Sequence, residues 1–337
     1  MAQFAKTSFD AAGYLASRPT YPARAYDLIL SYHRQRGGRT SHALDLGCGP
    51  GFMALNLAPH FESVTGLDPS SKMVAVGVQP PSGPKIRYGV GTSEDLGAAG
   101  IAPASVDLVV AGQAAHWFDH AKTWPQLARA LRPGGSVAYI GYGELTFPKY
   151  PHLNALVTRY HHDGAGIGPH WSQPGRSIVE GLLDRVPFPV TPDFDASLLS
   201  ALPDIEHDEP GVHPVADVIA EPEATPTPTA SNGGFEWDPT TAVRLKAGSE
   251  GPWFIHRQWT AKDFEAYLRT SSAVAGYQEA HPDDKAKRRS TGGDGDIVDL
   301  FVDEVRDALK KEGVDFDKEP VHCAYPLVLV LIKKKQQ

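Results

Sequence analysis

Short apolar runs alternate with amphipathic stretches through the first 143 residues. The runs are rich in leucine and β-branched side chains, which is typical of buried strands, and they cover residues 43–46, 64–67, 86–90, 106–110 and 137–140. Between them, apolar residues at helical spacing predict helices over 52–57, 70–78 and 121–131, the second capped by Ser70. Because strands and helices alternate, we predict a mostly parallel sheet covered by helices.

The regular alternation ends after Tyr142. Residues 144–194 are rich in Pro, His and aromatic side chains and are predicted to form a cap. Residues 203–234 are dominated by Pro, Glu, Asp and Thr, a composition that buries too little apolar surface to offset chain entropy, so we expect a mobile surface insertion there. Farther on we predict a strand over 253–259, a helix over 262–274, an exposed loop over 281–296, a helix over 297–311 and a strand over 326–332.

These elements suggest three parts of the chain. Residues 1–143 would form an N-terminal lid and a ligand-binding core, and residues 144–280 would form an acceptor-binding cap that includes the insertion. Residues 281–337 would supply a helix and a strand that complete the sheet.

The composition of the chain excludes some classes of binding partner. The formal net charge of -8 argues against a nucleic-acid partner, and the short basic run 333–335 is better explained as a solvated end of the last strand. Two cysteines form no disulfide framework, and no apolar stretch is long enough to cross a bilayer. We therefore expect a cytoplasmic protein without a membrane partner, and we assign no metal ligand. The sequence does not indicate an oligomeric state.

A glycine loop follows the first predicted strand and carries the strongest chemical signal. It reads Asp45-Leu46-Gly47-Cys48-Gly49-Pro50-Gly51, and a helix begins directly after it. Glycines let the backbone turn tightly and approach a ligand, and the helix directs its N-terminal amides toward the same space. A nucleotide-like ligand is indicated, although such a run alone is weak evidence because glycine turns also serve packing.

Three acidic or polar features narrow the ligand to S-adenosylmethionine. Asp45 precedes the glycines, where a carboxylate would repel a pyrophosphate but would tolerate a cationic, phosphate-free ligand. Asp68 ends the next strand and could accept hydrogen bonds from ribose hydroxyls. Residues 92–96, after the third strand, offer polar groups for an adenine amine. Each feature also has a structural explanation, namely loop anchor, helix cap and turn residue.

The loop motif resembles that of class I S-adenosylmethionine-dependent methyltransferases. A closer similarity is to the fungal trans-aconitate and cantharidin methyltransferase group, carried by Tyr14, Arg18 and residues 19–22, 115–119, 132–135 and 267–271. The likeness covers residues 9–150 and about 253–282. It implies a Rossmann-like α/β fold with a mostly parallel seven-stranded sheet and a helical cap insertion.

The resemblance also implies roles for individual residues. Tyr14 and Arg18 would close over the methionine end of the donor, and the guanidinium suits its carboxylate. His116 would lie beside the transferable methyl group as the candidate base, although a buried structural histidine is an equally good explanation. The other expected donor-binding residues are Asp45, Gly47, Cys48, Gly49, Gly51, Asp68, Pro69, Ser93, Glu94, Asp95, Gln113, Ala114 and Trp117.

The acceptor is less well specified. Candidates for its pocket are His116, Tyr142, Tyr150, His170, Trp171 and Arg176, and Arg176 is the natural partner of an anionic acceptor, although ordinary packing explains the cap residues equally well. Two departures from the family fall on this side of the site: Thr270-Ser271-Ser272, where Thr-Trp-Ser is common, and the long insertion at 203–234.

We therefore predict methyl transfer to a carboxylate or hydroxyl oxygen of an organic acid or secondary metabolite. A protein that uses bound donor for a rearrangement, an NAD-dependent oxidoreductase and a non-enzymatic binding protein are the alternatives.

Overall fold

Five parallel strands with their connecting helices account for most of the predicted core. The computed structural model describes residues 17–18, 20–200, 234–246 and 254–336. Tyr14 and residues 203–233 of the predicted insertion lie outside them. The parallel strands are β1 (His42–Leu46), β2 (Ser63–Asp68), β3 (Ile86–Val90), β4 (Val106–Gly112) and β5 (Leu131–Tyr142). The connecting helices are α3 (Phe52–Leu57), α4 (Ser71–Ala75) and α5 (His120–Ala130).

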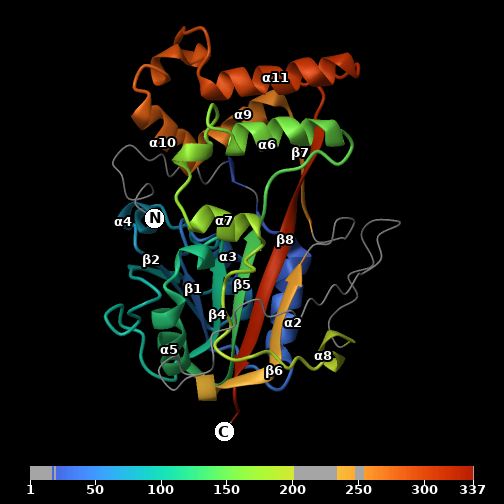
Figure 1. The fold of residues 1–337 in the computed structure, drawn as a ribbon. Helices are drawn as coiled ribbons and strands as arrows, with labels where there is room; N and C mark the ends of the chain where they lie inside the picture. Colours follow the sequence, from blue (N-terminus) through green and yellow to red (C-terminus); the bar gives the residue numbers. More distant parts are fainter. Residues whose placement is uncertain (1–16, 19, 201–233, 247–253, 337) are drawn as a thin grey trace. The chain divides into compact units, whose positions relative to one another are not determined.

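The sheet has the strand order β3-β2-β1-β4-β5-β8-β6, with β8 (Val321–Lys334) antiparallel to β5 and to β6 (Trp237–Lys246). Figure 1 shows β8 as the long red strand beside β5. The central strands are buried on both faces, as expected for a sheet covered by helices on both sides. The predicted α/β fold with a mostly parallel seven-stranded sheet is confirmed. A further strand, β7 (Phe254–Trp259), pairs with β8 as an eighth.

Two expectations about individual elements are wrong. Residues 262–274 form two helices, α9 (Ala261–Arg269) and α10 (Ser272–Ala280), because the Ser271 side chain accepts a hydrogen bond from the amide of Ala273 and starts a new helix. Strand β6 was not predicted. Its Asp238-Pro239 pair is a turn signal, and the structure places a register shift between Asp238 and Val243.

The chain forms two compact units. Unit 2 comprises residues 20–143, 177–254 and 326–337 and holds strands β1 to β6 and most of β8. It also contains helix α2 (Ala23–Arg34), the short helix α8 (Ser197–Ser200) and most of α7 (Gly175–Glu180). Unit 1 comprises residues 1–19, 144–176 and 255–325. Its helices are α6 (Asn154–His162), α9, α10 and α11 (Ile297–Lys311), with short 3₁₀ turns at 151–153, 168–170, 285–287 and 289–291.

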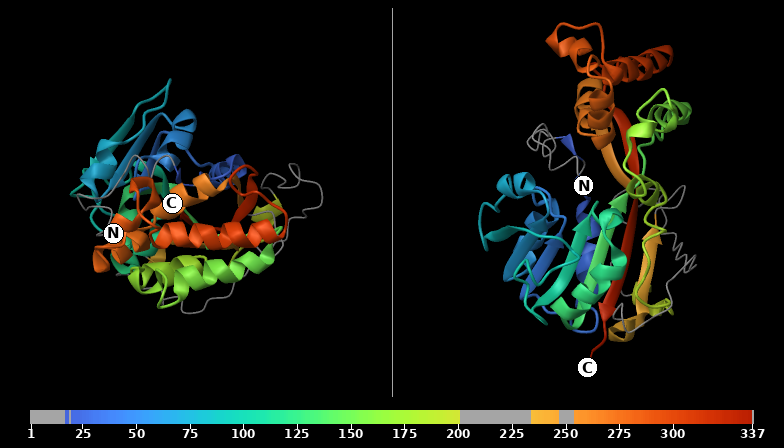
Figure 2. Two further views of the ribbon diagram at one scale, coloured as in Figure 1. Left: turned by 90° about the horizontal axis from the view of Figure 1, so that it is seen from above. Right: turned by 60° about the vertical axis from the view of Figure 1, so that its left-hand side comes forward.

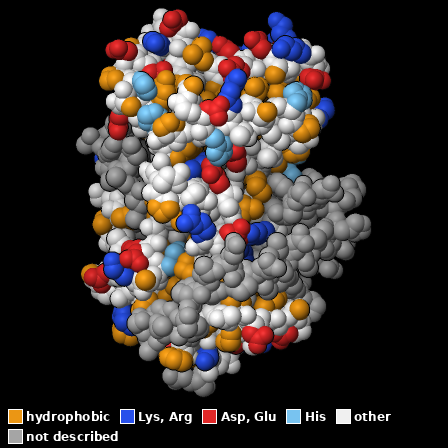
Figure 3. Space-filling view, viewed as in Figure 1, with side chains coloured by type: hydrophobic (Ala, Val, Ile, Leu, Met, Phe, Trp, Pro, Cys, Tyr) orange, Lys and Arg blue, Asp and Glu red, His pale blue; other side chains and the backbone are white. Residues whose placement is uncertain are grey.

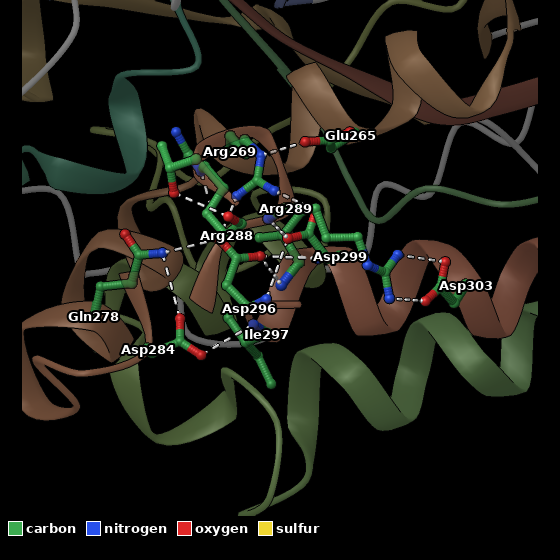
Figure 4. A network of polar contacts seen from close by, with 12 residues as sticks. Glu265, Arg269, Gln278, Asp284, Arg288, Arg289, Asp296, Ile297, Asp299 and Asp303 are labelled. Carbon is green, nitrogen blue, oxygen red and sulfur yellow. Dashed lines mark hydrogen bonds and ion pairs between the residues drawn. The ribbon is translucent and has the colours of Figure 1, made fainter. Parts of the chain in front are cut away.

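Unit 1 has an aromatic core and a polar network. Helices α6 and α11 lie side by side (Figure 2), and the ring of Tyr160 stacks on Phe301 with centroids 4.0 Å apart. Arg269 donates to Asp296 at 2.6 Å and to Asp299 at 2.7 Å, which ties the end of α9 to the beginning of α11 (Figure 4). Asp296 also caps α11 by accepting from the amides of Val298 and Asp299.

The surface carries both signs of charge. On the face drawn in Figure 3, Lys and Arg side chains are interspersed with Asp and Glu. Among the helices that the structure describes, none has both the length and the apolar character needed to cross a membrane.

Candidate functional site

The predicted donor-site residues of unit 2 lie at the carboxyl ends of neighbouring parallel strands. Strands β1 to β5 run in the same direction, so their ends meet at one edge of the sheet (Figure 1). Asp45 lies near the end of β1 and residues 47–51 follow that strand, whereas Asp68 ends β2 and Pro69 follows it. Residues 93–95 follow β3, residues 113–117 follow β4 and Tyr142 ends β5. This edge is where open α/β sheets bind their ligands.

The glycine loop needs its glycines for two different reasons. Gly51 has φ +101°, and a Cβ atom there would lie 1.9 Å from the hydroxyl oxygen of Tyr88, so a side chain cannot fit. Gly49 has φ +52°, but no described atom lies within 4 Å of its Cβ position. The loop is therefore packed against the sheet at Gly51 and has an open side at Gly49.

Asp68 fixes the loop to the end of β2. Its Oδ2 accepts a hydrogen bond from the amide of Gly49 at 2.9 Å, and its Oδ1 accepts from the amide of Ser70 at 2.8 Å. The amide of Cys48 also donates to the carbonyl of Leu67. Each carboxylate oxygen has a second lone pair, so Asp68 can hold the loop and still accept from a ligand.

Asp45 is a fully buried carboxyl group, and no Lys or Arg in the described part of the chain pairs with it. Its Oδ2 accepts from the amide of Ala54 at 3.0 Å, whereas its buried Oδ1 has no hydrogen-bond partner among the described residues. Burial, and next the charge of Asp68, raise the pKa of Asp45 to about 8, against the effect of the Ala54 hydrogen bond. Burial likewise raises the pKa of Asp68. A cation at this edge would offset the cost of both buried carboxylates, whereas a pyrophosphate would add to it.

The surroundings of Cys48 indicate that its side chain serves packing. Burial raises the pKa of its thiol, and the two nearby aspartates raise it further, which disfavours the nucleophilic thiolate. A Cβ atom on Gly66 would lie 2.9 Å from the Cys48 sulfur, so the thiol fills the space above that glycine.

The polar residues after β3 are bound to neighbouring parts of unit 2. The Ser93 hydroxyl is 3.0 Å from that of Thr123, Glu94 accepts from the amide of Asp119, and Asp95 accepts from the amide of Ala98. Ser93 is buried, so its hydroxyl mainly ties the loop to α5.

The end of β4 is held to the end of β5. Gln113 adopts φ +50°, and its side-chain amide donates to the carbonyl and accepts from the amide of Tyr142, both at 3.1 Å. The methyl group of Ala114 lies 2.5 Å from the Cβ position of Gly47, so these two small residues permit β1 and β4 to end close together.

His116 and Trp117 occupy a 3₁₀ turn after β4, with ring centroids 4.9 Å apart. The turn is held by His120, whose Nε2 donates to the carbonyl of Ala115 at 3.0 Å. Burial lowers the pKa of His120 to about 4, so this ring is neutral near pH 7. Sequence reasoning missed His120, because only its helical position after the turn brings it back to Ala115.

The other predicted residues belong to unit 1. Arg18 donates to the carbonyl of Thr270 at 3.1 Å and lies over the Tyr267 ring. Arg176 lies 4.1 Å above the Trp171 ring, so the structure brings these two together. His170 and Tyr150 have other neighbours: His170 packs against Tyr277, and Tyr150 against His152.

Comparisons with known proteins agree with this geometry. Residues 44–139 match the family described as a methyltransferase domain. Relatives are "Probable S-adenosylmethionine-dependent methyltransferase CRG1" of Saccharomyces cerevisiae, 29% identical over 176 residues, and methyltransferase cfoB of Aspergillus candidus, 33% identical over 192 residues. A solved structure from Anaeromyxobacter dehalogenans, named a putative type II methyltransferase, is 26% identical with a TM-score of 0.60, covering 95% of this chain and 99% of that one.

Residues 44–139 therefore resemble a methyltransferase domain, and the sheet has the strand order of class I methyltransferases. The predicted family likeness is confirmed, and the methyl donor of this family is S-adenosylmethionine. The alignments with the yeast and Aspergillus methyltransferases cover 51% and 52% of this chain, and the chain spans only 59% of the length of each of those proteins.

Proposed function

We propose that this methyltransferase transfers a methyl group from S-adenosylmethionine to an oxygen of a small organic acid or secondary metabolite. The observation that carries the proposal is the open side of the loop at Gly49, bordered by two buried carboxyl groups that pair with no basic side chain in the ranges the structure describes. Such a site suits a cationic ligand that needs close backbone contact. Fungal methyltransferases among the relatives support a small-molecule acceptor.

The residues at the sheet edge would bind and orient the donor. Asp68 would accept from the ribose hydroxyls, Asp45 would balance the donor's positive charge, and the polar residues after β3 would bind the adenine. Arg18 belongs to unit 1, and its role toward the methionine carboxylate remains a prediction from the family resemblance. When bound, the donor supplies an electrophilic methyl group, so the protein's main task is to align the acceptor and exclude water.

A matched pair of glycine substitutions tests the donor site. Gly49→Ala and Gly83→Ala each place a side chain at positive φ, and neither Cβ position has a described atom within 4 Å. Both variants should lose about 1 kcal/mol of unfolding free energy. Only Gly49→Ala should weaken donor binding, by tenfold or more in calorimetry, because its methyl group occupies the open side of the loop.

The same measurement decides against the proposal if Gly49→Ala binds S-adenosylmethionine as tightly as Gly83→Ala does. A screen of small carboxylic acids and phenols, read by S-adenosylhomocysteine release and by mass gain of the acceptor, then separates methyl transfer from donor binding without transfer.

A further inference from the structure

The side chain of Tyr88 lies against three glycines of unit 2. Tyr88 is in the middle of β3 and pairs with Gly66 of β2 in the sheet. A Cβ atom on Gly66 would lie 2.9 Å from the Tyr88 ring, and one on Gly77, after α4, would lie 2.6 Å from it. The third glycine is Gly51, whose Cβ position is 1.9 Å from the Tyr88 hydroxyl oxygen. The ring therefore fills a space that exists only because these three positions lack side chains.

The Tyr88 hydroxyl also bonds to the chain that follows α4. It donates to the carbonyl oxygen of Val78 at 2.7 Å. Burial raises the pKa of Tyr88, so the hydroxyl keeps its proton and remains a donor at neutral pH. The amide of Val78 in turn donates to the carbonyl oxygen of Pro50 at 2.9 Å. Two hydrogen bonds in series thus connect β3 to the glycine loop.

The peptide group between Pro50 and Gly51 is held on both sides. Its carbonyl accepts from the amide of Val78, and its own amide donates to the carbonyl oxygen of Cys48 at 2.9 Å. Gly51 has φ +101°, and a glycine lacks the Cβ atom that restricts rotation of the peptide group in other residues. The two bonds therefore select one orientation of a peptide group that the covalent structure leaves free to rotate.

The open position of the loop lies between two anchors. Asp68, at the end of β2, accepts from the amide of Gly49, and Val78 donates to the carbonyl of Pro50. Val78 can serve as an anchor only while its own position is fixed, and the Tyr88 hydroxyl fixes it. A ligand that makes close backbone contact at Gly49 needs both neighbouring peptide groups in one orientation before it binds, because ordering them on binding would cost affinity.

We propose that Tyr88 is a positioning residue for the donor site: through Val78, its hydroxyl keeps the Pro50–Gly51 peptide group in the orientation in which the loop binds S-adenosylmethionine. This inference rests on the proposed function. Tyr88 acts on the loop and not on the reacting atoms, so it determines what fraction of the molecules can bind the donor. The apparent donor affinity falls in proportion to that fraction.

Calorimetry of Tyr88→Phe with S-adenosylmethionine tests the proposal. The substitution keeps the ring against the three glycines and removes only the hydroxyl, so the protein should remain folded. Donor binding should weaken by about threefold to tenfold, because loss of one hydrogen bond lets the peptide group leave the binding orientation.

Tyr32→Phe is the matched control for this measurement. The Tyr32 hydroxyl, on α2, also donates to a backbone carbonyl at 2.7 Å, that of Thr241 on β6. Because Thr241 is buried, Tyr32→Phe should lower the urea midpoint of unfolding at least as much as Tyr88→Phe does. It should leave donor affinity unchanged, so a general loss of stability would not imitate the expected result.

Amide hydrogen exchange of the ligand-free protein measures the loop directly. In Tyr88→Phe the amides of Val78 and Gly51 should exchange at least about threefold faster than in the wild type, because both bonds of the peptide group open more often. Tyr32→Phe should leave both amides at the wild-type rate, and saturating S-adenosylmethionine should slow them again in Tyr88→Phe. Wild-type exchange at both amides in Tyr88→Phe would overturn the proposal.

The outcomes keep the two proposals apart. If the wild-type protein does not bind S-adenosylmethionine, or if Gly49→Ala binds it as tightly as Gly83→Ala does, the proposed function fails. If Gly49→Ala weakens binding but Tyr88→Phe has the same donor affinity as Tyr32→Phe, the donor site stands and the role assigned to Tyr88 is wrong.

Discussion

Asp45 is an unusual residue because its burial is not compensated by a cation. One carboxyl oxygen is bonded to the Ala54 amide and the other is buried without a described partner. A carboxylate in such surroundings holds its proton, which accounts for a pKa of about 8. A sulfonium or ammonium group close by would favour the ionised form, so ligand charge and proton release are coupled.

We therefore predict that donor binding releases a proton near pH 7. Affinity for S-adenosylmethionine should rise with pH up to about 8, because above that value Asp45 is ionised before the donor arrives. Calorimetric titrations in buffers of different ionisation enthalpy measure the number of protons released. In Asp45→Asn that number should fall toward zero; release that persists in the variant would assign the proton to another group.

At the scale of helices and strands, the stability of α11 depends on one polar residue. Asp296 is fully buried, caps the helix and pairs with Arg269 (Figure 4). Asp296→Ala should lower the free energy of unfolding by about 3–5 kcal/mol, because the Arg269 guanidinium would remain buried with one partner fewer.

Urea unfolding measures this effect against a surface control. The ion pair of Asp315 with Lys318 is exposed and screened by solvent, so Asp315→Ala should lower the free energy of unfolding far less than Asp296→Ala does. Similar losses in the two variants would show that the Asp296 network adds little to stability.

A helix or strand can be predicted from sequence when the residues that determine it lie within or next to that segment. Residues 52–57 and 297–311 are helices as predicted, since their apolar spacing lies within the segment and the Asp296 cap directly precedes the second helix. Strand β6 carries a turn signal at Asp238-Pro239, which the sheet accommodates by a register shift. Its pairing with β8, more than 80 residues away, outweighs the local preference.

The residues of the candidate site also fall into those that could be located from sequence and those that could not. The strand ends that carry Asp45, Asp68 and Gln113 could be located from sequence because each follows an apolar run. The pairing of Arg176 with Glu144 could not, since the two residues are 32 positions apart on either side of helix α6. The donor-site roles given to individual residues remain predictions.

At the scale of the whole molecule, buried titratable groups set the pH dependence of stability. Burial lowers the pKa of both His33 and His120 to about 4, whereas the pKa of Asp45 is raised to about 8. For these three groups alone, between about pH 4 and 6.5 the unfolded chain binds two extra protons on the two histidines, and the folded chain binds one on Asp45. Between about pH 6.5 and 8 only the Asp45 difference remains.

Stability should therefore rise by roughly 1.4 kcal/mol per pH unit up to about pH 6.5 and then fall toward pH 8. Urea unfolding across this range gives the profile. Asp45→Asn should abolish the fall above pH 6.5, and His120→Phe should flatten the rise below it. A profile that is unchanged in both variants would mean that other groups dominate.

Strand β8 shows how a single polar residue can select one alignment of a chain. Residues 327–332 are buried on both faces, so sliding the strand by one position would exchange one apolar row for another at little cost. Lys333 breaks this degeneracy, since its ammonium group donates to the carbonyls of His33 and Gln35 at the end of α2. A slipped strand would leave that charge in an apolar environment, so the lysine fixes the register of β8.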